Sequence, residues 1–291
     1  MPDKVNPNDL IAFQGAAGAN SDMACRVVYP ELGTLPCESF EETFAAVREG
    51  RARLAMIPVE NSVAGRVADI HHLLPDSGLH IIAEHFQRVH HCLLALKGAK
   101  LADVKAVHSH VHALNQCRNV IAQLKLKPVV HVDTAGAAAD VAAWKDKSQA
   151  AIASPLAGEI YGLDVLRANI EDAEHNTTRF LVMAREAVDP NPARGPVVTT
   201  FVFNVRNVPA ALYKALGGFA TNGINMTKLE SYMVGGRFAA TLFYSDVEGH
   251  PSERPLKLAL EELGFFSTSL KILGVYPAHP QRYKAELSAE A

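Results

Sequence analysis

Short apolar runs alternate with segments of helical periodicity over the first 186 residues of the chain. One helix is marked by Ser39 and Glu42, which have the spacing of a capping box, and Gly50 would end it. The apolar runs that predict strands are residues 10–13, 54–57, 81–83, 92–95, 106–107, 129–132, 150–153 and 181–183. Strands that alternate with helices in this way predict an α/β fold, with a mostly parallel sheet covered by helices.

The pattern changes after a segment rich in proline. Residues 189–196 contain three prolines and a glycine, which neither a helix nor a central strand accommodates, so residues 187–197 are predicted to be a linker. Beyond it the pattern predicts strands at 199–205, 226–233, 237–246 and 270–276, helices at 209–220 and 252–263, a turn at Gly235-Gly236, and a helix end at Gly264. This βαββαβ order is the ferredoxin-like plan.

The composition narrows the class of protein. The chain has 291 residues, of which 48% are hydrophobic and 20% charged, a balance typical of soluble globular proteins. Its formal net charge of −3 gives no basic footprint for nucleic acid, and no apolar run is as long as a membrane span. The first six residues lack the features of a signal peptide. We therefore expect a cytoplasmic protein with no nucleic-acid or membrane partner.

Cysteines and histidines offer little support for a metal site. The cysteines are scattered, with no Cys-x-x-Cys pair, and in a cytosolic chain such residues are usually small buried hydrophobes: Cys25, Cys37, Cys92 and Cys117. His108 and His112 would share a face only if one helix covered both, yet Val107 reads as the end of a strand. No carboxylate stands nearby at ligand spacing, so no metal is expected.

Small and hydroxyl-bearing residues follow most predicted strands of the first region. They occur at residues 14–21, 58–65, 108–110, 133–136 and 154–155. Ordinary helix capping would explain any one of these segments. Several helix starts around one crevice, together with a Thr178-Arg179 pair beside the run at 181–183, favour a small anionic ligand. The glycine spacing of a dinucleotide site and the lysine of a phosphate loop are both missing after Gln14, so we expect no cofactor.

Taken together, these motifs resemble those of prephenate dehydratase. They are residues 57–62 with Gly65 and Val67, Ser109-His110 with Ala113-Leu114 and Gln116-Cys117, Thr134-Ala135, and Asn176 with Thr178-Arg179-Phe180. The tail resembles an ACT regulatory domain at residues 207–216 and 228–231. The resemblance implies a two-lobed, periplasmic-binding-protein-like catalytic domain at 9–186 and an ACT domain at 198–278. The chain would cross between lobes near 85–91 and 166–180, with the site in the cleft.

The resemblance also implies an activity. Prephenate would lose its ring carboxylate as CO₂ and its C4 hydroxyl as water, giving phenylpyruvate, and aromatisation would drive the reaction without a cofactor. Thr178 would assist the leaving hydroxyl by hydrogen-bond donation. Substrate oxygens would be bound by Asn61, Ser62, Ser109, Gln116 and Thr134. Arg179 would anchor a carboxylate, and Phe180 would pack against the ring.

Regulation is the second implication of the resemblance. An ACT domain would bind L-phenylalanine through Asn207, Ala210, Ala211, Leu212, Glu230 and Ser231, and would pair side by side into a homodimer or homotetramer. The chain departs from the family at Ala210, where many relatives have glycine, and at Tyr232-Met233, where many have Arg-Pro. Bulk at Ala210 would narrow an effector pocket. The alternative is a structural ACT domain that mainly makes a dimer.

Two other functions stay open. Arogenate, in which an amine replaces the keto oxygen, would need the same chemistry and would favour a carboxylate near the side chain, for which Glu60 is a candidate. A non-catalytic amino-acid sensor could combine a binding-protein cleft with an ACT domain. It would not need Thr178-Arg179-Phe180 in addition to residues 60–62. The first loop, residues 15–21, also differs from relatives that often carry Pro, Tyr or Phe there.

Overall fold

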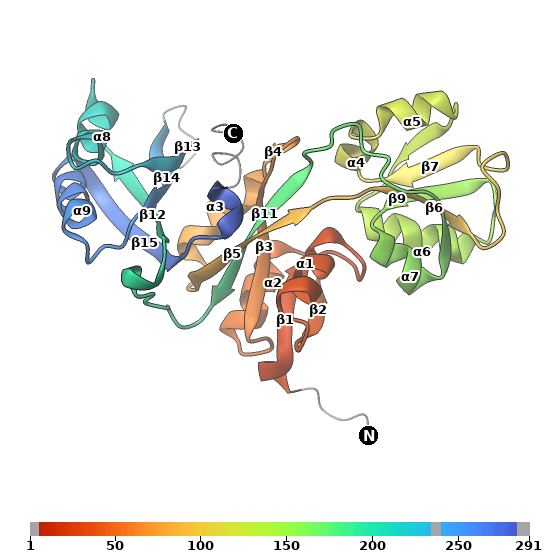
Figure 1. The fold of residues 1–291 in the computed structure, drawn as a ribbon, viewed down its shortest axis with the longest axis horizontal. Coiled ribbons are helices and arrows are strands. Elements are labelled where there is room, and N and C mark those ends of the chain that lie inside the picture. The colour runs from red at the N-terminus through yellow and green to blue at the C-terminus, as the bar shows by residue number, and fades with distance from the viewer. Residues whose placement is uncertain (1–5, 234–239, 284–291) are drawn as a thin grey trace. The chain divides into compact units, whose positions relative to one another are not determined.

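The computed structural model describes residues 6–233 and 240–283, and its chain forms two compact units. Unit 1 comprises Met1–Ile70 and His85–Phe180, and unit 2 comprises His71–Glu84 and Leu181–Ala291. Figure 1 shows the elements of each. Within the described residues, no helix has the length and apolar character needed to cross a membrane.

The first lobe of unit 1 is a small parallel sheet with helices packed on it. Its elements are η1 (Pro7–Asp9), β1 (Leu10–Gln14), α1 (Asn20–Val28), β2 (Gly33–Cys37), α2 (Phe40–Arg48), β3 (Leu54–Asn61) and β4 (Gly65–Arg66). Both β2 and β3 pair in parallel with β1, and β4 pairs antiparallel with the end of β3. Ser39 caps α2 by accepting a hydrogen bond from the Glu42 backbone N–H at 3.2 Å, as the sequence predicts.

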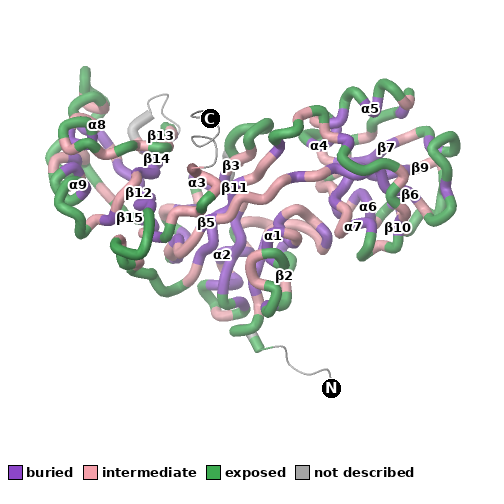
Figure 2. The backbone as a smooth tube through the Cα atoms, in the orientation of Figure 1, coloured by how far each residue is buried: buried purple, intermediate pink, exposed green. Residues whose placement is uncertain are grey.

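The second lobe of unit 1 is built around a five-stranded sheet in the order β10-β6-β9-β7-β8. Its elements are β6 (Cys92–Leu96), β7 (Ala106–Ser109), α4 (Val111–Asn115), α5 (Arg118–Gln123), β8 (Lys127–Val130), α6 (Thr134–Trp144), β9 (Gln149–Ala153), α7 (Pro155–Tyr161) and β10 (Leu163–Arg167). Hydrophobic clusters cover both faces of this sheet, which explains why its central strands read as continuous apolar runs. Figure 2 shows the same strands as buried.

Two long strands, β5 (His80–Arg88) and β11 (Thr177–Ala184), flank the segments in which the chain passes from one lobe to the other. β5 leads into the second lobe, and β11 follows the return from it. The connections between the lobes therefore fall near residues 85–91 and 166–180, where the family resemblance places them. β11 begins four residues before the predicted strand at 181–183, so the Thr178 motif lies inside the strand.

Unit 2 contains the predicted βαββαβ order. Its elements are β12 (Val197–Val205), α8 (Ala211–Thr221), β13 (Met226–Met233), β14 (Ala240–Glu248), α9 (Arg254–Phe266) and β15 (Ser267–Pro277), together with η2 (Leu74–Asp76), η3 (Pro192–Arg194), η4 (Pro280–Tyr283) and the end of α3 (Ala68–Leu73). The strand order is β13-β14-β12-β15-β5, and α8 and α9 pack with the sheet around one core. β15 pairs with β5 at Gly274 and Ile81, where any side chain on Gly274 would collide with the Ile81 backbone.

Some boundaries differ from the sequence-based ones. Helix α9 runs through Gly264 to Phe266. A glycine costs a helix only about 1 kcal/mol relative to alanine, and the helix is held by buried side chains, of which Leu263 is the last. The predicted turn at Gly235-Gly236 and residues 237–239 of the next predicted strand lie outside the described residues. Residues 71–84 belong to unit 2 rather than to the predicted continuous domain 9–186, because β5 pairs with β15 and His71 stacks on Tyr232.

Candidate active site

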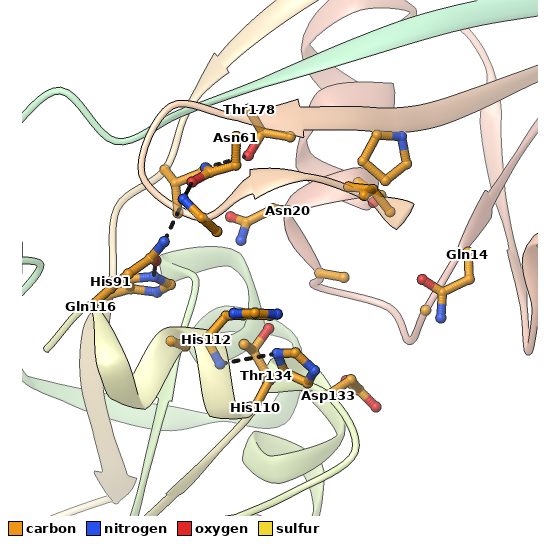
Figure 3. Close-up of a pocket in the computed structure, with 18 of the residues that line it drawn as sticks. Gln14, Asn20, Asn61, His91, His110, His112, Gln116, Asp133, Thr134 and Thr178 are labelled. Atoms are coloured by element: carbon orange, nitrogen blue, oxygen red, sulfur yellow. Dashed lines mark hydrogen bonds between the residues drawn. The ribbon is translucent and has the colours of Figure 1, made fainter. Parts of the chain in front are cut away.

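A pocket of about 340 Å³ lies in unit 1 and takes residues from both lobes. It is lined by Gln14, Gly15, Ala19, Asn20, Ser21, Pro58, Asn61, Ala64, Val67, Val89, His91, His110, His112, Ala113, Gln116, Val132, Asp133, Thr134, Thr178 and Phe180. The described lining has Asp133 as its carboxylate and contains no lysine or arginine. Figure 3 shows Thr178 and Asn61 toward one end, with His110, Asp133 and Thr134 toward the other.

Strand alternation decides which residues of the Thr178 motif reach this pocket. Thr178 and Phe180 line it, whereas Arg179, between them on β11, does not. Successive side chains of a strand point to opposite faces, so this division follows from the strand conformation. The Arg179 guanidinium instead binds the Glu60 carboxylate, with Nη1 and Oε1 2.9 Å apart, and only 4% of its side chain is exposed.

The Thr178 hydroxyl is oriented by an amide. Asn61, at the end of β3, donates from Nδ2 to Thr178 Oγ1 at 3.0 Å. A hydroxyl has two acceptor positions and one hydrogen to donate, so this contact occupies an acceptor position and leaves the hydrogen available. Thr178 is therefore arranged as a hydrogen-bond donor toward a ligand in the pocket.

Further amides hold Asn61 in place. Its Nδ2 also donates to Asn176 Oδ1 at 2.7 Å, and its Oδ1 accepts from the backbone N–H groups of residues 63 and 64 at 3.0 and 2.8 Å. Asn176 donates to Gln116 Oε1 at 3.0 Å, and His91 Nε2 lies 2.9 Å from the same oxygen. We call His91, Gln116, Asn176, Asn61 and Thr178 the Thr178 network. This network joins the first lobe to the second, and most hydrogen-bonding groups of its side chains are paired within it.

His91 is the buried end of this network. Gln116 Oε1 can only accept, so His91 Nε2 carries the hydrogen and Nδ1 is left as an acceptor. Burial lowers the pKa of His91 and favours the neutral ring. The hydrogen bond that His91 donates to Gln116 and the negative charge of Glu171 oppose this shift. Among the described residues, neither His91 Nδ1 nor Asn20 Oδ1 has a hydrogen-bond partner, although both residues line the pocket.

The other end of the pocket holds two more histidines. The rings of His110 and His112 are 5.0 Å apart, and His110 Nδ1 accepts the backbone N–H of His112 at 3.3 Å, which caps α4. Asp133 caps α6 by accepting from the Gly136 N–H at 2.6 Å, and Thr134 begins that helix. Burial lowers the pKa of His110, His112 lowers it further, and Asp133 raises it.

Two predicted substrate contacts besides Arg179 lie outside the described lining, namely Ser62 and Ser109. The Ser62 hydroxyl donates to the His175 carbonyl at 2.6 Å and accepts the Thr177 N–H at 2.9 Å, so it joins the β3–β4 turn to the start of β11. Ser109 is fully buried, and its hydroxyl donates to the Ile152 carbonyl at 2.6 Å. Both hydroxyls therefore bond to backbone atoms in the structure.

The first loop is held against the second lobe. Tyr161 donates its hydroxyl hydrogen to the Ala17 carbonyl at 3.0 Å, and Ser154 donates to the Gly18 carbonyl. Gly18 has a φ of +86°, and a Cβ there would lie 2.7 Å from the Ala157 Cα. Glycine is therefore required at position 18 both for its positive φ and for its close approach to Ala157. The loop thereby presents Asn20 and Ser21 to the pocket.

Sequence reasoning missed His91, His112, Asn20 and Asp133 as individual pocket residues. The segments at residues 14–21, 108–110 and 133–136 indicate three regions of the pocket, but not which side chains line it. Nothing in the apolar run that follows His91 indicates its role.

The predicted effector residues lie around α8 and β13. Ala210 has a left-handed φ of 61° before α8, and Glu230 pairs with Lys228 at 3.1 Å.

The comparisons with known proteins place the chain in a family. The prephenate dehydratase family model matches residues 11–188, and the chain belongs to that family. It is 56% identical over 280 residues to a "Bifunctional N-acyl-homoserine lactone acylase/prephenate dehydratase" of Komagataeibacter europaeus, covering 96% of this chain and 100% of that one. It is 40% identical to "Arogenate dehydratase/prephenate dehydratase 1, chloroplastic" of Arabidopsis thaliana, covering 92% and 71%. The solved structure of prephenate dehydratase in complex with L-Phe from Arthrobacter aurescens has a TM-score of 0.84 at 28% identity, covering 97% and 96%.

Proposed function

We propose that the protein is a prephenate dehydratase that forms phenylpyruvate. The observation that carries this proposal is the Thr178 hydroxyl, which lines the pocket with an acceptor position taken by Asn61. A donor at this point fits a reaction whose difficult event is the departure of a hydroxyl group. Membership of the family supports the same activity.

In the proposed reaction one electron pair moves through the ring. The bond between C1 and the ring carboxylate breaks and releases CO₂, its electrons complete the aromatic ring, and the C4–O bond breaks. The oxygen leaves as hydroxide and becomes water by protonation. Thr178 donates a hydrogen bond to this oxygen as negative charge develops on it, which lowers the energy of the transition state more than that of the bound substrate.

Two substitutions test the role of Thr178. Thr178→Val keeps the shape but removes the hydroxyl, and we expect it to lower kcat about 10²–10⁴-fold. Thr178→Ser retains the donor and should keep much of the activity. Phenylpyruvate is followed by its absorbance in alkali, with circular dichroism as the check on folding. A folded Thr178→Val protein with unchanged kcat would contradict the assignment.

Arogenate is the alternative substrate, and a relative named for both activities supports testing it. The Glu60 carboxylate is bound to Arg179 and does not line the pocket, so it is a poor candidate for an ammonium group. Asp133 is the carboxylate that does line it. Parallel assays with prephenate and arogenate decide the preference. Turnover of neither substrate, with amino acids still bound, would favour the non-catalytic sensor.

We propose that unit 2 is an ACT regulatory domain that binds L-phenylalanine and forms a homodimer or homotetramer. Its βαββαβ order supports the domain assignment, and the L-Phe complex of the Arthrobacter aurescens relative supports the effector. The effector site would use Asn207, Ala210, Ala211, Leu212, Glu230 and Ser231. Inhibition by phenylalanine, with light scattering to measure assembly, tests both parts. Unchanged activity with bound phenylalanine would leave a site without regulation.

A second candidate activity is hydrolysis of N-acyl-homoserine lactones at the amide bond. The similarity over the full length of the bifunctional relative favours it. Water would be the nucleophile, and His110 or His112 could accept its proton. Release of homoserine lactone is measured on the same preparation as dehydratase activity. Acylase activity that persists in Thr178→Val would separate the two reactions.

A further inference from the structure

The described lining of the pocket lacks the permanent positive charge that a substrate with two carboxylates would require. Prephenate carries two carboxylates, yet the described lining contains no lysine or arginine, and Arg179 lies on the other face of β11. The lining side chains that can become cationic are His91, His110 and His112. Of these, His91 is 3% exposed and already bonded to Gln116. The other two histidines are therefore the groups able to supply positive charge to an anion.

The position of the two histidines matches the shape of the substrate. In Figure 3, His110 and His112 lie on the side of the pocket away from Thr178 and Asn61. In prephenate, the hydroxyl at C4 and the pyruvyl side chain at C1 are on opposite ends of the ring. When the hydroxyl contacts Thr178, the side chain points toward these histidines. Thr134 at the start of α6 faces the same end.

We propose that His110 and His112 together bind the side-chain carboxylate of the substrate, an inference that rests on the proposed dehydratase function. Imidazolium groups form charge-assisted hydrogen bonds with a carboxylate, and two adjacent rings can contact its two oxygens. The side-chain carboxylate keeps its charge throughout the reaction. A contact to it therefore stabilises the bound substrate and the transition state alike, and sets KM rather than kcat.

The ring carboxylate is the wrong partner for this pair. It leaves as CO₂, so its negative charge moves away in the transition state. A cation that held it would stabilise the bound substrate more than the transition state and would slow decarboxylation. The histidines are therefore assigned to the carboxylate that stays.

Protonation gives this contact a pH dependence. In the empty pocket, burial and His112 depress the pKa of His110, and Asp133 at the start of α6 is the charged group that opposes them. An arriving carboxylate favours the imidazolium form and raises that pKa. In this form Nδ1 of His110 carries a hydrogen, so it no longer accepts the His112 N–H. Binding should therefore take up protons near neutral pH. KM should rise as pH increases through the pKa of the bound state, because the neutral ring no longer attracts the anion.

Steady-state kinetics test the assignment. His112→Gln and His110→Asn, the latter keeping an acceptor near the start of α4, should each raise KM for prephenate about 10-fold or more, the usual effect of losing a hydrogen bond between charged groups. kcat should change less than about 3-fold. His80→Gln, on β5 and outside the described lining, is the control. An unchanged KM, or a lower kcat at unchanged KM, would overturn the proposal.

Product inhibition identifies the carboxylate. Phenylpyruvate keeps the side-chain carboxylate and lacks the ring carboxylate. Its inhibition constant should rise in the two variants by the same factor as KM. A raised KM with an unchanged inhibition constant would assign the histidines to the ring carboxylate and overturn the proposal.

Calorimetry separates this inference from the proposed function. Phenylpyruvate binding to the Thr178→Val protein is measured in buffers with different ionisation enthalpies, which reports proton uptake without turnover. Proton uptake that disappears in His112→Gln and His110→Asn supports the histidine assignment even if wild-type protein fails to convert prephenate. Turnover by the wild type with no proton uptake would refute the histidine assignment alone.

Discussion

The contact between Arg179 and Glu60 predicts that Arg179 affects stability rather than substrate binding. In Arg179→Met, Glu60 loses a cation 2.9 Å away. Removing one partner of a fully buried pair costs about 3–5 kcal/mol. The Arg179 side chain is 4% exposed and that of Glu60 is 33% exposed, so water can stabilise part of the remaining charge. We therefore expect a loss of about 2–3 kcal/mol in the free energy of unfolding.

Thermal unfolding and steady-state kinetics measure the two effects separately. A loss of that size lowers Tm by about 4–12 °C for a domain of this size class. KM for prephenate should stay within about 2-fold of wild type, because Arg179 does not line the pocket. Replacing both residues by methionine should recover part of the stability, since an apolar pair leaves no uncompensated charge.

The opposite pattern would refute this reasoning. An arginine that anchored a substrate carboxylate through a bidentate contact would raise KM about 100-fold or more when removed, at nearly unchanged Tm. That outcome would mean that Arg179 leaves Glu60 when substrate binds. Glu60→Gln is the matched control, because it weakens the same pair while keeping the guanidinium.

Two further changes have defined expectations. Ala210→Gly should raise the free energy of unfolding by about 1 kcal/mol, because Ala210 has a φ of 61°, where a Cβ is strained. Calorimetry would show this as a higher Tm, and a lower Tm would contradict the expectation. His91→Gln can place an amide N–H near the lost Nε2 and should keep kcat, whereas His91→Asn is too short to reach Gln116. The asparagine variant should therefore lower kcat about 3–10-fold at similar KM. Equal kcat values in the two variants would exclude a positioning role for His91.

The fold could be predicted largely because its strands and caps are local signals. β13 coincides with the predicted strand at residues 226–233, and Ser39 caps the helix that its spacing indicates. Gly264 shows the limit of such rules. A glycine is a weak helix breaker, and the buried side chains of α9 outweigh it. Pairing of β5 with β15 joins residues almost two hundred positions apart, and no local pattern encodes it.

The candidate site could be located from the sequence but not resolved into roles. The apolar run predicts a strand at residues 181–183 with Thr178 beside it, whereas β11 already begins at Thr177. The sequence could have corrected this, because adjacent β-branched residues favour strand, and alternation would then have separated Thr178 from Arg179. The partners of Ser62 and Ser109 could not have been predicted, since both hydroxyls bond to backbone carbonyls of segments distant in sequence.

The Thr178 network changes what the polar motif residues are for. The family resemblance leads us to expect that Asn61 and Gln116 bind substrate oxygens. In the structure, however, the side-chain amide of each forms hydrogen bonds with other residues of the Thr178 network. A threonine hydroxyl that could rotate freely would alternate between donating and accepting, and only the donating state helps a hydroxyl leave. Asn61 fills one of the two acceptor positions of the hydroxyl and so directs its hydrogen away from the amide, and Asn176 with Gln116 prevents the Asn61 amide from flipping. Because Gln116 belongs to the second lobe and Asn61 to the first, the donor state of Thr178 depends on contacts that both lobes supply.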